Sequence, residues 1–148
     1  MHSNKMIHRD FKSENVMINW QGITKLADFG LSLDLSARSS EICFTFAGTE
    51  VYMAPELFAL SEDGAVGYSY PVDWWALGIT LYECFTKLQM PFPEEDEDAM
   101  RKVIMSKRAF AALNSSKIPD PEALDFLKDL LKKSPKQRLG TKNQPGVK

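Results

Sequence analysis

The sequence predicts a mainly α-helical domain with one short β-hairpin near its start. An almost uninterrupted apolar run predicts a central helix over 72–86, because a proline stands directly before it and helices favour proline at their first position. Two later helices are expected at about 95–107 and 121–133, where acidic or capping residues precede apolar residues at helical spacing. β-prone runs on both sides of residues 20–22 predict the hairpin.

The predicted central helix has apolar residues on almost every side. Trp74, Trp75, Tyr82 and Phe85 all fall within it. A helix without a polar face is normally buried in the middle of a domain, and these large rings need covering elements around them. The later helices are too few to cover every side. We therefore expect covering structure upstream of Met1 that this chain lacks.

Composition and charge argue against several classes of function. Of 148 residues, 44% are hydrophobic and 26% are charged, as in one soluble globular domain. With 18 basic and 20 acidic residues the net charge is −2, so neither a nucleic acid nor an anionic membrane is expected as a partner. No apolar stretch reaches the ~18 residues of a membrane span, and we expect a cytoplasmic location, with a nuclear one as the alternative. Cys43 and Cys84 lie in dissimilar contexts, so reduced thiols are expected.

The hairpin has a predicted register that would bring two oxygen ligands together. If Gln21 and Gly22 form a two-residue loop, Asn15 lies opposite Asp28. Opposed Cα atoms in an antiparallel ladder are about 4.5–5.5 Å apart, so an amide oxygen and a carboxylate could reach one hard cation. Few protein oxygens, with water and phosphate as further ligands, are typical of Mg²⁺ sites. Such a pair, taken alone, is also compatible with a purely structural role.

Three motifs follow one another in order along the chain. Residues 8–15 read His-Arg-Asp-Phe-Lys-Ser-Glu-Asn, residues 28–30 read Asp-Phe-Gly, and residues 54–56 read Ala-Pro-Glu. Together they resemble the signature of eukaryotic Ser/Thr protein kinases, and the resemblance spans essentially the whole chain. It implies a partial protein kinase domain over 1–148, corresponding to the C-lobe. In that domain 8–15 would be the catalytic loop, 28–30 the Mg-binding motif and 28–56 the activation segment.

The resemblance implies roles for three residues in phosphoryl transfer. Asp10 would accept or orient the proton of the substrate hydroxyl. Lys12 would stabilise the moving phosphoryl group, because a cation lowers the energy of the charge that develops there. A lysine at this position is similar to Ser/Thr kinases rather than tyrosine kinases. Thr49 would line the catalytic cleft near both side chains.

Further residues would bind the cofactors ATP and Mg²⁺ by the same resemblance. Asn15 and Asp28 would hold the metal, and Lys12 would contact the phosphates. Met17 would form the apolar floor beneath adenine. Phe29 would be a packing residue that reports an active or inactive position of the loop.

Three segments are similar to the AGC group of kinases: 45–56, 73–78 and 138–140. In that group an upstream kinase phosphorylates the residue that corresponds to Thr45, and its phosphate would pair with Arg9 and order the loop. An ordinary loop hydroxyl is the alternative for Thr45. Weaker candidates for phosphorylation are Ser39 and Ser40.

The resemblance also assigns structural and substrate-binding residues. Glu56 and Arg138 would form a structural ion pair, and Asp73 would tie the central helix to the backbone of the catalytic loop. Glu14 and Glu83 match positions that receive an arginine of the substrate in basophilic kinases, so a protein substrate with basic residues upstream of its Ser or Thr is expected. The alternative for each is an ordinary solvated carboxylate. The family pattern is not followed at three positions, which leaves finer specificity open: Ser13, Glu50 and Val51.

Several parts of a complete kinase domain are missing from the sequence. It contains no Gly-x-Gly-x-x-Gly loop, and the strand lysine and helix glutamate of the N-lobe have no counterpart. We expect an N-lobe to be absent, both ends to be those of a fragment, and the chain to be inactive alone. The alternative is a non-catalytic kinase-like module that binds or regulates a partner. A small-molecule phosphotransferase is disfavoured by residues 45–49 and 54–56.

Overall fold

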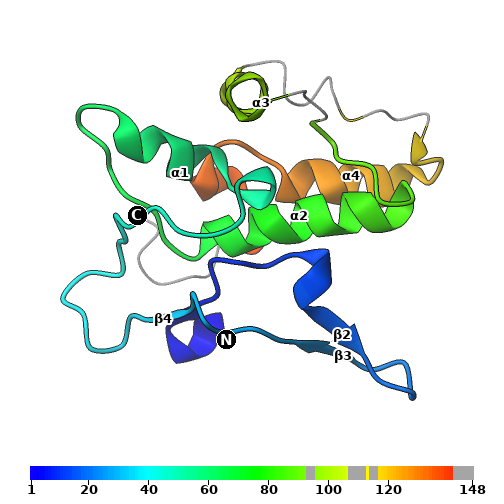
Figure 1. Ribbon diagram of the computed structural model, residues 1–148, viewed down its shortest axis with the longest axis horizontal. Coiled ribbons are helices and arrows are strands. Elements are labelled where there is room, and N and C mark those ends of the chain that lie inside the picture. The colour runs from blue at the N-terminus through cyan, green and yellow to red at the C-terminus, as the bar shows by residue number, and fades with distance from the viewer. Residues whose placement is uncertain (93–95, 107–112, 114–116, 142–148) are drawn as a thin grey trace.

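A central helix crosses the middle of the molecule, and the other elements are arranged around it (Figure 1). The computed structural model describes residues 1–92, 96–106, 113 and 117–141. The α-helices in this part of the chain are α1 (Pro55–Phe58), α2 (Pro71–Phe85), α3 (Glu97–Met105) and α4 (Pro121–Leu130). Helix α4 lies beside α2, which is the central helix.

Two small antiparallel sheets lie on the other side of α2 from α4 (Figure 1). Strand β1 (Met6–Ile7) pairs with β4 (Leu33–Asp34). Strand β2 (Val16–Ile18) pairs with β3 (Thr24–Leu26) in the hairpin that projects from the molecule. The catalytic-loop motif therefore lies between one strand of each sheet.

Aspartate caps define where the two later helices begin. Asp96 accepts a hydrogen bond from the N–H of Ala99 at 2.7 Å, and Asp120 accepts one from the N–H of Glu122 at 2.9 Å. The sequence predicted helices at about 95–107 and 121–133. Positions 95 and 107 lie outside the described residues, and α4 ends three residues earlier than expected, at Leu130.

The hairpin loop has three residues, so the predicted two-residue loop is wrong. The N–H of Asn19 donates to the carbonyl of Ile23 at 3.0 Å and closes a loop over 20–22. Gly22 has a φ of 79°, which is the left-handed conformation that a three-residue hairpin loop requires at its last position.

The longer loop shifts the register of the hairpin by one residue. Val16 lies opposite Leu26, and the N–H of Ala27 donates to the carbonyl of Asn15 at 2.8 Å. Asn15 is therefore opposite Ala27 and not opposite Asp28, as the sequence had predicted. Because Asp28 is the first residue beyond this ladder, its side chain is directed by its own backbone conformation rather than by cross-strand pairing.

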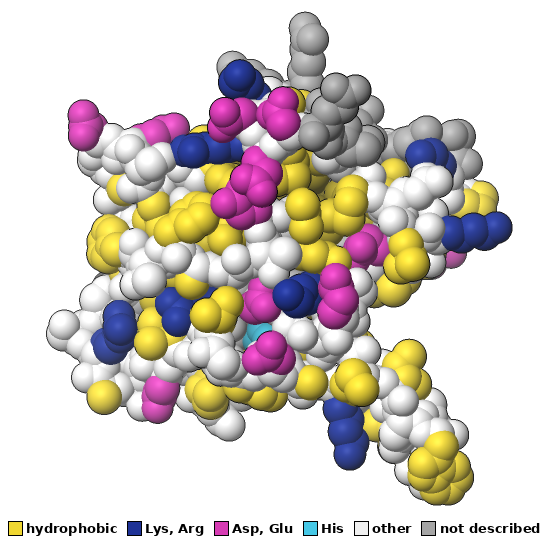
Figure 2. All heavy atoms as spheres, in the orientation of Figure 1, with side chains coloured by type: hydrophobic (Ala, Val, Ile, Leu, Met, Phe, Trp, Pro, Cys, Tyr) yellow, Lys and Arg dark blue, Asp and Glu magenta, His cyan; other side chains and the backbone are white. Residues whose placement is uncertain are grey.

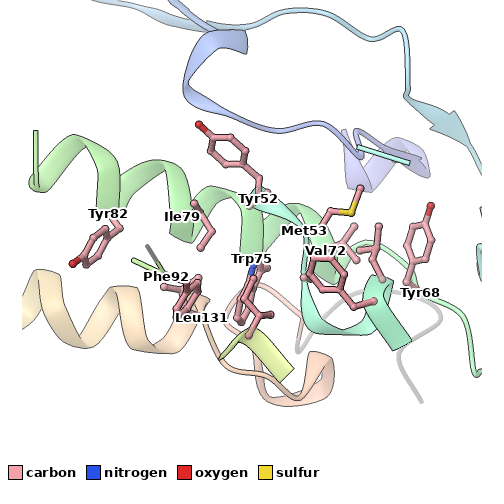
Figure 3. Packing of buried hydrophobic residues seen from close by; sticks show 14 of the residues in the cluster. Tyr52, Met53, Tyr68, Val72, Trp75, Ile79, Tyr82, Phe92 and Leu131 are labelled. Atoms are coloured by element: carbon pink, nitrogen blue, oxygen red, sulfur yellow. The ribbon is translucent and has the colours of Figure 1, made fainter. Parts of the chain in front are cut away.

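The core forms where α2 packs against α4 (Figure 3). Trp75 is fully buried, and its ring stacks on Phe92 with centroids 6.0 Å apart. Gly78 permits the close approach of the two helices, because a Cβ atom there would lie 2.8 Å from Cδ2 of Leu131. The opposite side of α2 is less covered, since Trp74 and Leu77 are only half-buried.

Large apolar side chains also remain at the surface of the hairpin. Trp20 at its tip is 92% exposed, and Met17, Ile18 and Ile23 are each more than half exposed. Figure 2 shows these hydrophobic side chains at the lower right of the molecule. Among the described helices, none has the length and apolar composition needed to cross a membrane.

Candidate active site

The backbone of the catalytic loop is fastened to the start of α2 by Asp73. One carboxylate oxygen accepts a hydrogen bond from the N–H of His8, and the other accepts one from the N–H of Arg9, both at 2.9 Å. His2 contacts the same carboxylate at 2.7 Å. Asp73 is buried, so these bonds are shielded from water and hold the loop in one place on the helix. This is the anchoring role that the resemblance implied for Asp73.

Two candidate site residues are among the five described non-glycine residues with positive φ. Arg9 has a φ of 69° and Asp28 a φ of 54°, values that L-residues rarely adopt. Strained backbone is concentrated at functional sites, where surrounding contacts maintain it. Gly48 approaches the catalytic loop so closely that a Cβ atom there would lie 2.5 Å from the carbonyl oxygen of Arg9. The activation segment and the catalytic loop are therefore in direct backbone contact.

Asp10, Lys12 and Thr49 form one hydrogen-bonded group. The hydroxyl of Thr49 donates to Oδ1 of Asp10 at 2.7 Å, and Nζ of Lys12 donates to the same hydroxyl at 2.9 Å. Nζ of Lys12 also lies 3.2 Å from Oδ2 of Asp10. The structure thus brings together the three residues that the sequence had assigned to catalysis, from two segments far apart in the chain.

The protonation state of Asp10 follows from this group. Burial by itself raises the pKa of its carboxyl, but the hydrogen bonds from Thr49 and Lys12 and the charge of Lys12 outweigh that effect. The pKa of Asp10 therefore lies below its usual range. At neutral pH the carboxylate is ionised and able to accept a proton.

Asn15 and Asp28 present oxygen atoms suited to a hard cation. Nδ2 of Asn15 donates to the carbonyl of Asp10 at 2.9 Å, and Oδ1 of Asp28 accepts from the N–H of Gly30 at 3.1 Å. Among the described residues no donor contacts Oδ1 of Asn15 or Oδ2 of Asp28. The described residues contain no cluster of three or more His, Cys, Asp or Glu side chains that could bind a metal. The two free oxygens fit Mg²⁺, which takes few protein ligands and completes its shell with water and phosphate.

Glu14 and Glu83 are joined through a residue that sequence reasoning missed. The hydroxyl of Tyr52 donates to Glu83 at 2.9 Å and lies 3.3 Å from a carboxylate oxygen of Glu14. The N–H of Glu14 and the hydroxyls of Ser13 and Tyr52 hold the pKa of Glu14 below its usual range. Burial, together with the two carboxylates, raises the pKa of Tyr52, so its hydroxyl stays protonated. Two acidic side chains thus meet beside the catalytic loop.

The hydroxyl of Tyr68 connects the backbone of Thr45 to the side chain of Arg9. The hydroxyl of Tyr68 donates to the carbonyl oxygen of Thr45 at 2.7 Å and accepts from Nη1 of Arg9 at 3.4 Å. Nε of Arg9 donates to the carbonyl of Leu31 at 2.6 Å. The side chain of Thr45 is exposed. The weaker candidates for phosphorylation are also exposed: Ser39 and Ser40.

Two residues assigned to the nucleotide and the loop are exposed to different degrees. Met17 is 57% exposed, so the described part of the chain leaves more than half of its side chain uncovered. Phe29 is about half exposed and contacts His8 edge-on, with ring centroids 5.1 Å apart. Phe29 therefore contacts the catalytic loop while about half of its side chain faces solvent.

Arg138 and Glu56 form a bidentate ion pair. Nη1 and Nη2 of Arg138 lie 2.7 and 2.9 Å from the two carboxylate oxygens of Glu56. Arg138 is fully buried, donates to the carbonyl of Pro71 at 2.7 Å, and lies over the ring of Trp75. The pair ties the end of the activation segment to the core.

The sequence pattern of the protein kinase domain matches residues 1–144. The chain belongs to the protein kinase family. Its relatives are Ser/Thr kinases of the AGC type, so the resemblance predicted from residues 8–15, 28–30 and 45–56 is confirmed.

Three relatives illustrate how much of a kinase this chain covers. Serine/threonine protein kinase ypkA of Aspergillus fumigatus is 38% identical over 148 residues, which are 100% of this chain and 22% of that protein. RAC-beta serine/threonine-protein kinase of Rattus norvegicus is 37% identical over 140 residues, or 95% of this chain and 27% of that protein. Protein kinase C of Drosophila melanogaster is also 37% identical over 140 residues, or 95% of this chain and 18% of that protein. The chain thus spans about a quarter or less of each of these relatives.

Within this part of a kinase domain, Tyr52 and Tyr68 are the residues at the candidate site that sequence reasoning missed. Each connects segments that lie far apart in the chain, and each does so through a hydroxyl group on an otherwise buried ring. A tyrosine among other aromatic residues reads as a core residue, so no local pattern distinguishes these two from Tyr70 or Tyr82.

Proposed function

We propose that this chain is the C-lobe of a Ser/Thr protein kinase of the AGC group. The complete kinase would transfer the γ-phosphate of ATP to serine or threonine hydroxyls of proteins. The group of Asp10, Lys12 and Thr49 is the observation that carries this proposal. An ionised carboxylate lies 3.2 Å from an ammonium group, and a hydroxyl bonds to both. A proton acceptor and a cation at one point are what transfer of an anionic phosphoryl group to a hydroxyl requires.

Asp10 would orient the substrate hydroxyl and take its proton. The bond that forms joins the hydroxyl oxygen to the γ-phosphorus, and the bond that breaks joins this phosphorus to the bridging oxygen of ADP. Thr49 holds one oxygen of Asp10, so the other oxygen, near Lys12, is the one directed at the reacting groups. Lys12 would stabilise the charge on the transferred group.

Asn15 and Asp28 would hold Mg²⁺ on the phosphates. The metal would neutralise phosphate charge and orient the terminal phosphate. Their free oxygens support this role, and the bond from Nδ2 of Asn15 to the Asp10 carbonyl links the metal ligands to the catalytic loop. The one-residue register shift does not remove the proposal, because Asp28 leaves the ladder with its own backbone conformation.

The substrate would be a protein with basic residues before the phosphorylated position. Glu14 and Glu83 present two carboxylates that Tyr52 holds together. A guanidinium group can pair with carboxylates in a bidentate manner, so an arginine side chain fits this arrangement. Phosphorylation of Thr45 by an upstream kinase would add a charge beside Arg9 and order the activation segment.

The isolated chain would not catalyse this reaction efficiently. Met17, the proposed adenine floor, is largely exposed, and the described residues supply nothing above it. Phosphoryl transfer depends on positioning, which contributes roughly 7–11 kcal/mol in well-oriented reactions. The exposed hairpin surface around Trp20 also favours a second candidate function, in which the chain binds a partner without turnover.

A kinase assay on two forms of the protein tests both candidates. The 148-residue chain and a longer protein that includes the sequence encoded upstream receive ATP, Mg²⁺ and serine peptides with or without upstream arginines. We expect turnover of the arginine-containing peptide by the longer form alone, and a roughly 10²–10⁴-fold loss in its Asp10→Asn variant. Asp125→Asn, a charge change at the exposed side of α4, is the matched control.

The outcomes separate the proposals. Full activity of Asp10→Asn in the longer form would contradict the catalytic role of this site. Turnover by the short chain would contradict its expected inactivity. Partner binding without turnover by either form would favour the non-catalytic module.

A further inference from the structure

Tyr68, which lies three residues before the start of α2, connects the catalytic loop to the activation segment. Its hydroxyl donates to the carbonyl oxygen of Thr45 at 2.7 Å and accepts from the guanidinium group of Arg9 at 3.4 Å. The side chain is only 3% exposed, and its ring lies at one end of the buried cluster (Figure 3). A buried hydroxyl with two partners is satisfied and well ordered.

The backbone of Tyr68 adds a second attachment two residues before Thr45. The N–H of Cys43 donates to the carbonyl of Tyr68 at 2.7 Å, and the N–H of Tyr68 donates to the carbonyl of Cys43 at 2.9 Å. Gly67 makes this close pairing feasible, because it has a φ of 77° and a Cβ atom there would lie 2.8 Å from the Cys43 carbonyl oxygen. One residue thus holds the activation segment by its backbone at Cys43 and by its side chain at Thr45.

The side chains that flank Thr45 are largely exposed, although Phe46 contacts the buried ring of Phe58 with centroids 6.3 Å apart. Phe44 is 63% exposed and Phe46 is 50% exposed. Thr45 is itself exposed. Among the described residues, the hydrogen bonds that link the Thr45 backbone to Arg9 both pass through the hydroxyl of Tyr68.

We infer that Tyr68 is a positioning residue that holds the Thr45 backbone beside Arg9 before any phosphate is present. The inference rests on the proposed role of Thr45 as the phosphorylated residue. A phosphate added to a segment that is already ordered meets Arg9 without the entropy cost of ordering several residues. Burial raises the pKa of Tyr68, so its hydroxyl remains a protonated donor at physiological pH.

Limited proteolysis of the 148-residue chain tests the structural half of this inference. Chymotrypsin cleaves after phenylalanine, so its sites after Phe44 and Phe46 bracket Thr45. Tyr68→Phe keeps the ring and removes only the hydroxyl. We expect cleavage at these two bonds to become about fivefold faster, the factor that corresponds to one typical hydrogen bond. Gly67→Ala should accelerate the same cleavages further, because its Cβ atom disrupts the pairing with Cys43.

Thr80→Val is the matched control, because it also removes one buried hydroxyl that donates to a carbonyl. The hydroxyl of Thr80 bonds within α2, to Ala76 at 3.0 Å. This variant should leave cleavage at Phe44 and Phe46 unchanged. Unchanged cleavage in Tyr68→Phe, or equal acceleration in Thr80→Val, would overturn the inference, because the effect would then be absent or merely global.

Phosphorus NMR on the chain with phosphothreonine at position 45 tests the link to Arg9. A guanidinium group close to the phosphate favours its dianion and lowers its second pKa. We expect this pKa to be lower with Tyr68 than in Tyr68→Phe, although both side chains pack alike. Identical phosphate titrations would overturn the positioning role. Neither measurement requires kinase activity, so a failure of the proposed function leaves a distinct result.

Discussion

Replacing Arg138 by methionine is expected to destabilise the chain strongly. Arg138 is fully buried and donates to both oxygens of Glu56 at 2.7 and 2.9 Å. It also donates to the carbonyls of Pro71 and Lys132. Methionine keeps much of the volume but leaves the carboxylate of Glu56, whose side chain is 12% exposed, without its cation. Breaking a buried pair from one side costs about 3–5 kcal/mol.

Thermal and urea unfolding measure this loss. In a domain of this size each kcal/mol lowers the melting temperature by about 2–4 °C, so the expected decrease is about 6–20 °C. Lys128→Met is the control. The distance from Nζ of Lys128 to Asp125 is 2.9 Å, similar to the Arg138 pair, but these side chains are 45% and 75% exposed. Its removal should change the free energy of unfolding by less than about 0.5 kcal/mol.

Equal losses in the two variants would refute the reasoning, because the two pairs differ mainly in burial. A double variant provides a sharper test. If the stranded carboxylate causes the loss, Glu56→Gln in the Arg138→Met background should recover part of the stability. Further destabilisation by Glu56→Gln would show that packing or the carbonyl contacts dominate instead.

Three further predictions concern the site and the helix ends. Thr49→Val should raise the pKa of Asp10, because it removes a hydrogen bond to the carboxylate. Above the ordinary aspartate pKa of 3.8 the variant should be less stable than the original chain, and this difference in stability should shrink as the pH falls through the lowered pKa of the folded state. Urea unfolding across the acid range measures the difference, and a pH-independent difference would contradict the prediction. Gly48→Ala should cost about 1–3 kcal/mol, because its φ is 125° and its Cβ atom would press on the Arg9 carbonyl, and an unchanged melting temperature would count against this close contact. Asp120→Ala should cost about 1 kcal/mol through loss of the cap, whereas Asp120→Asn should retain most of it in the same unfolding assay.

The hairpin shows how far local sequence reasoning extends. Its two strands were predictable from β-prone runs, but the loop length was not, because a glycine at position 22 suits both loop types. The side chain of Asn19 favours the longer loop, since its oxygen accepts hydrogen bonds from the N–H groups of Gln21 and Ile23 at 3.0 and 2.9 Å. That choice moved Asn15 opposite Ala27.

The site shows a similar division. The motifs identify Asp10, Lys12 and Thr49 as candidates by residue type and order. The sequence does not give the distances between these side chains, because those distances depend on the contact of the activation segment with the catalytic loop. The exposure of Met17 was also not predictable from the sequence, because it depends on which elements surround the hairpin.

The sequence by itself determined the family, the order of the motifs and the start of α4 at Pro121, whereas α3 begins at Glu97 and not at about residue 95. These features depend on residue type and on neighbours a few positions away, as at the caps Asp96 and Asp120. Only the tertiary structure decided that Tyr52 joins two glutamates and that Tyr68 joins Thr45 to Arg9. A tyrosine hydroxyl bonds to a residue far away in the chain only where tertiary packing positions its ring, and no local sequence pattern predicts that position.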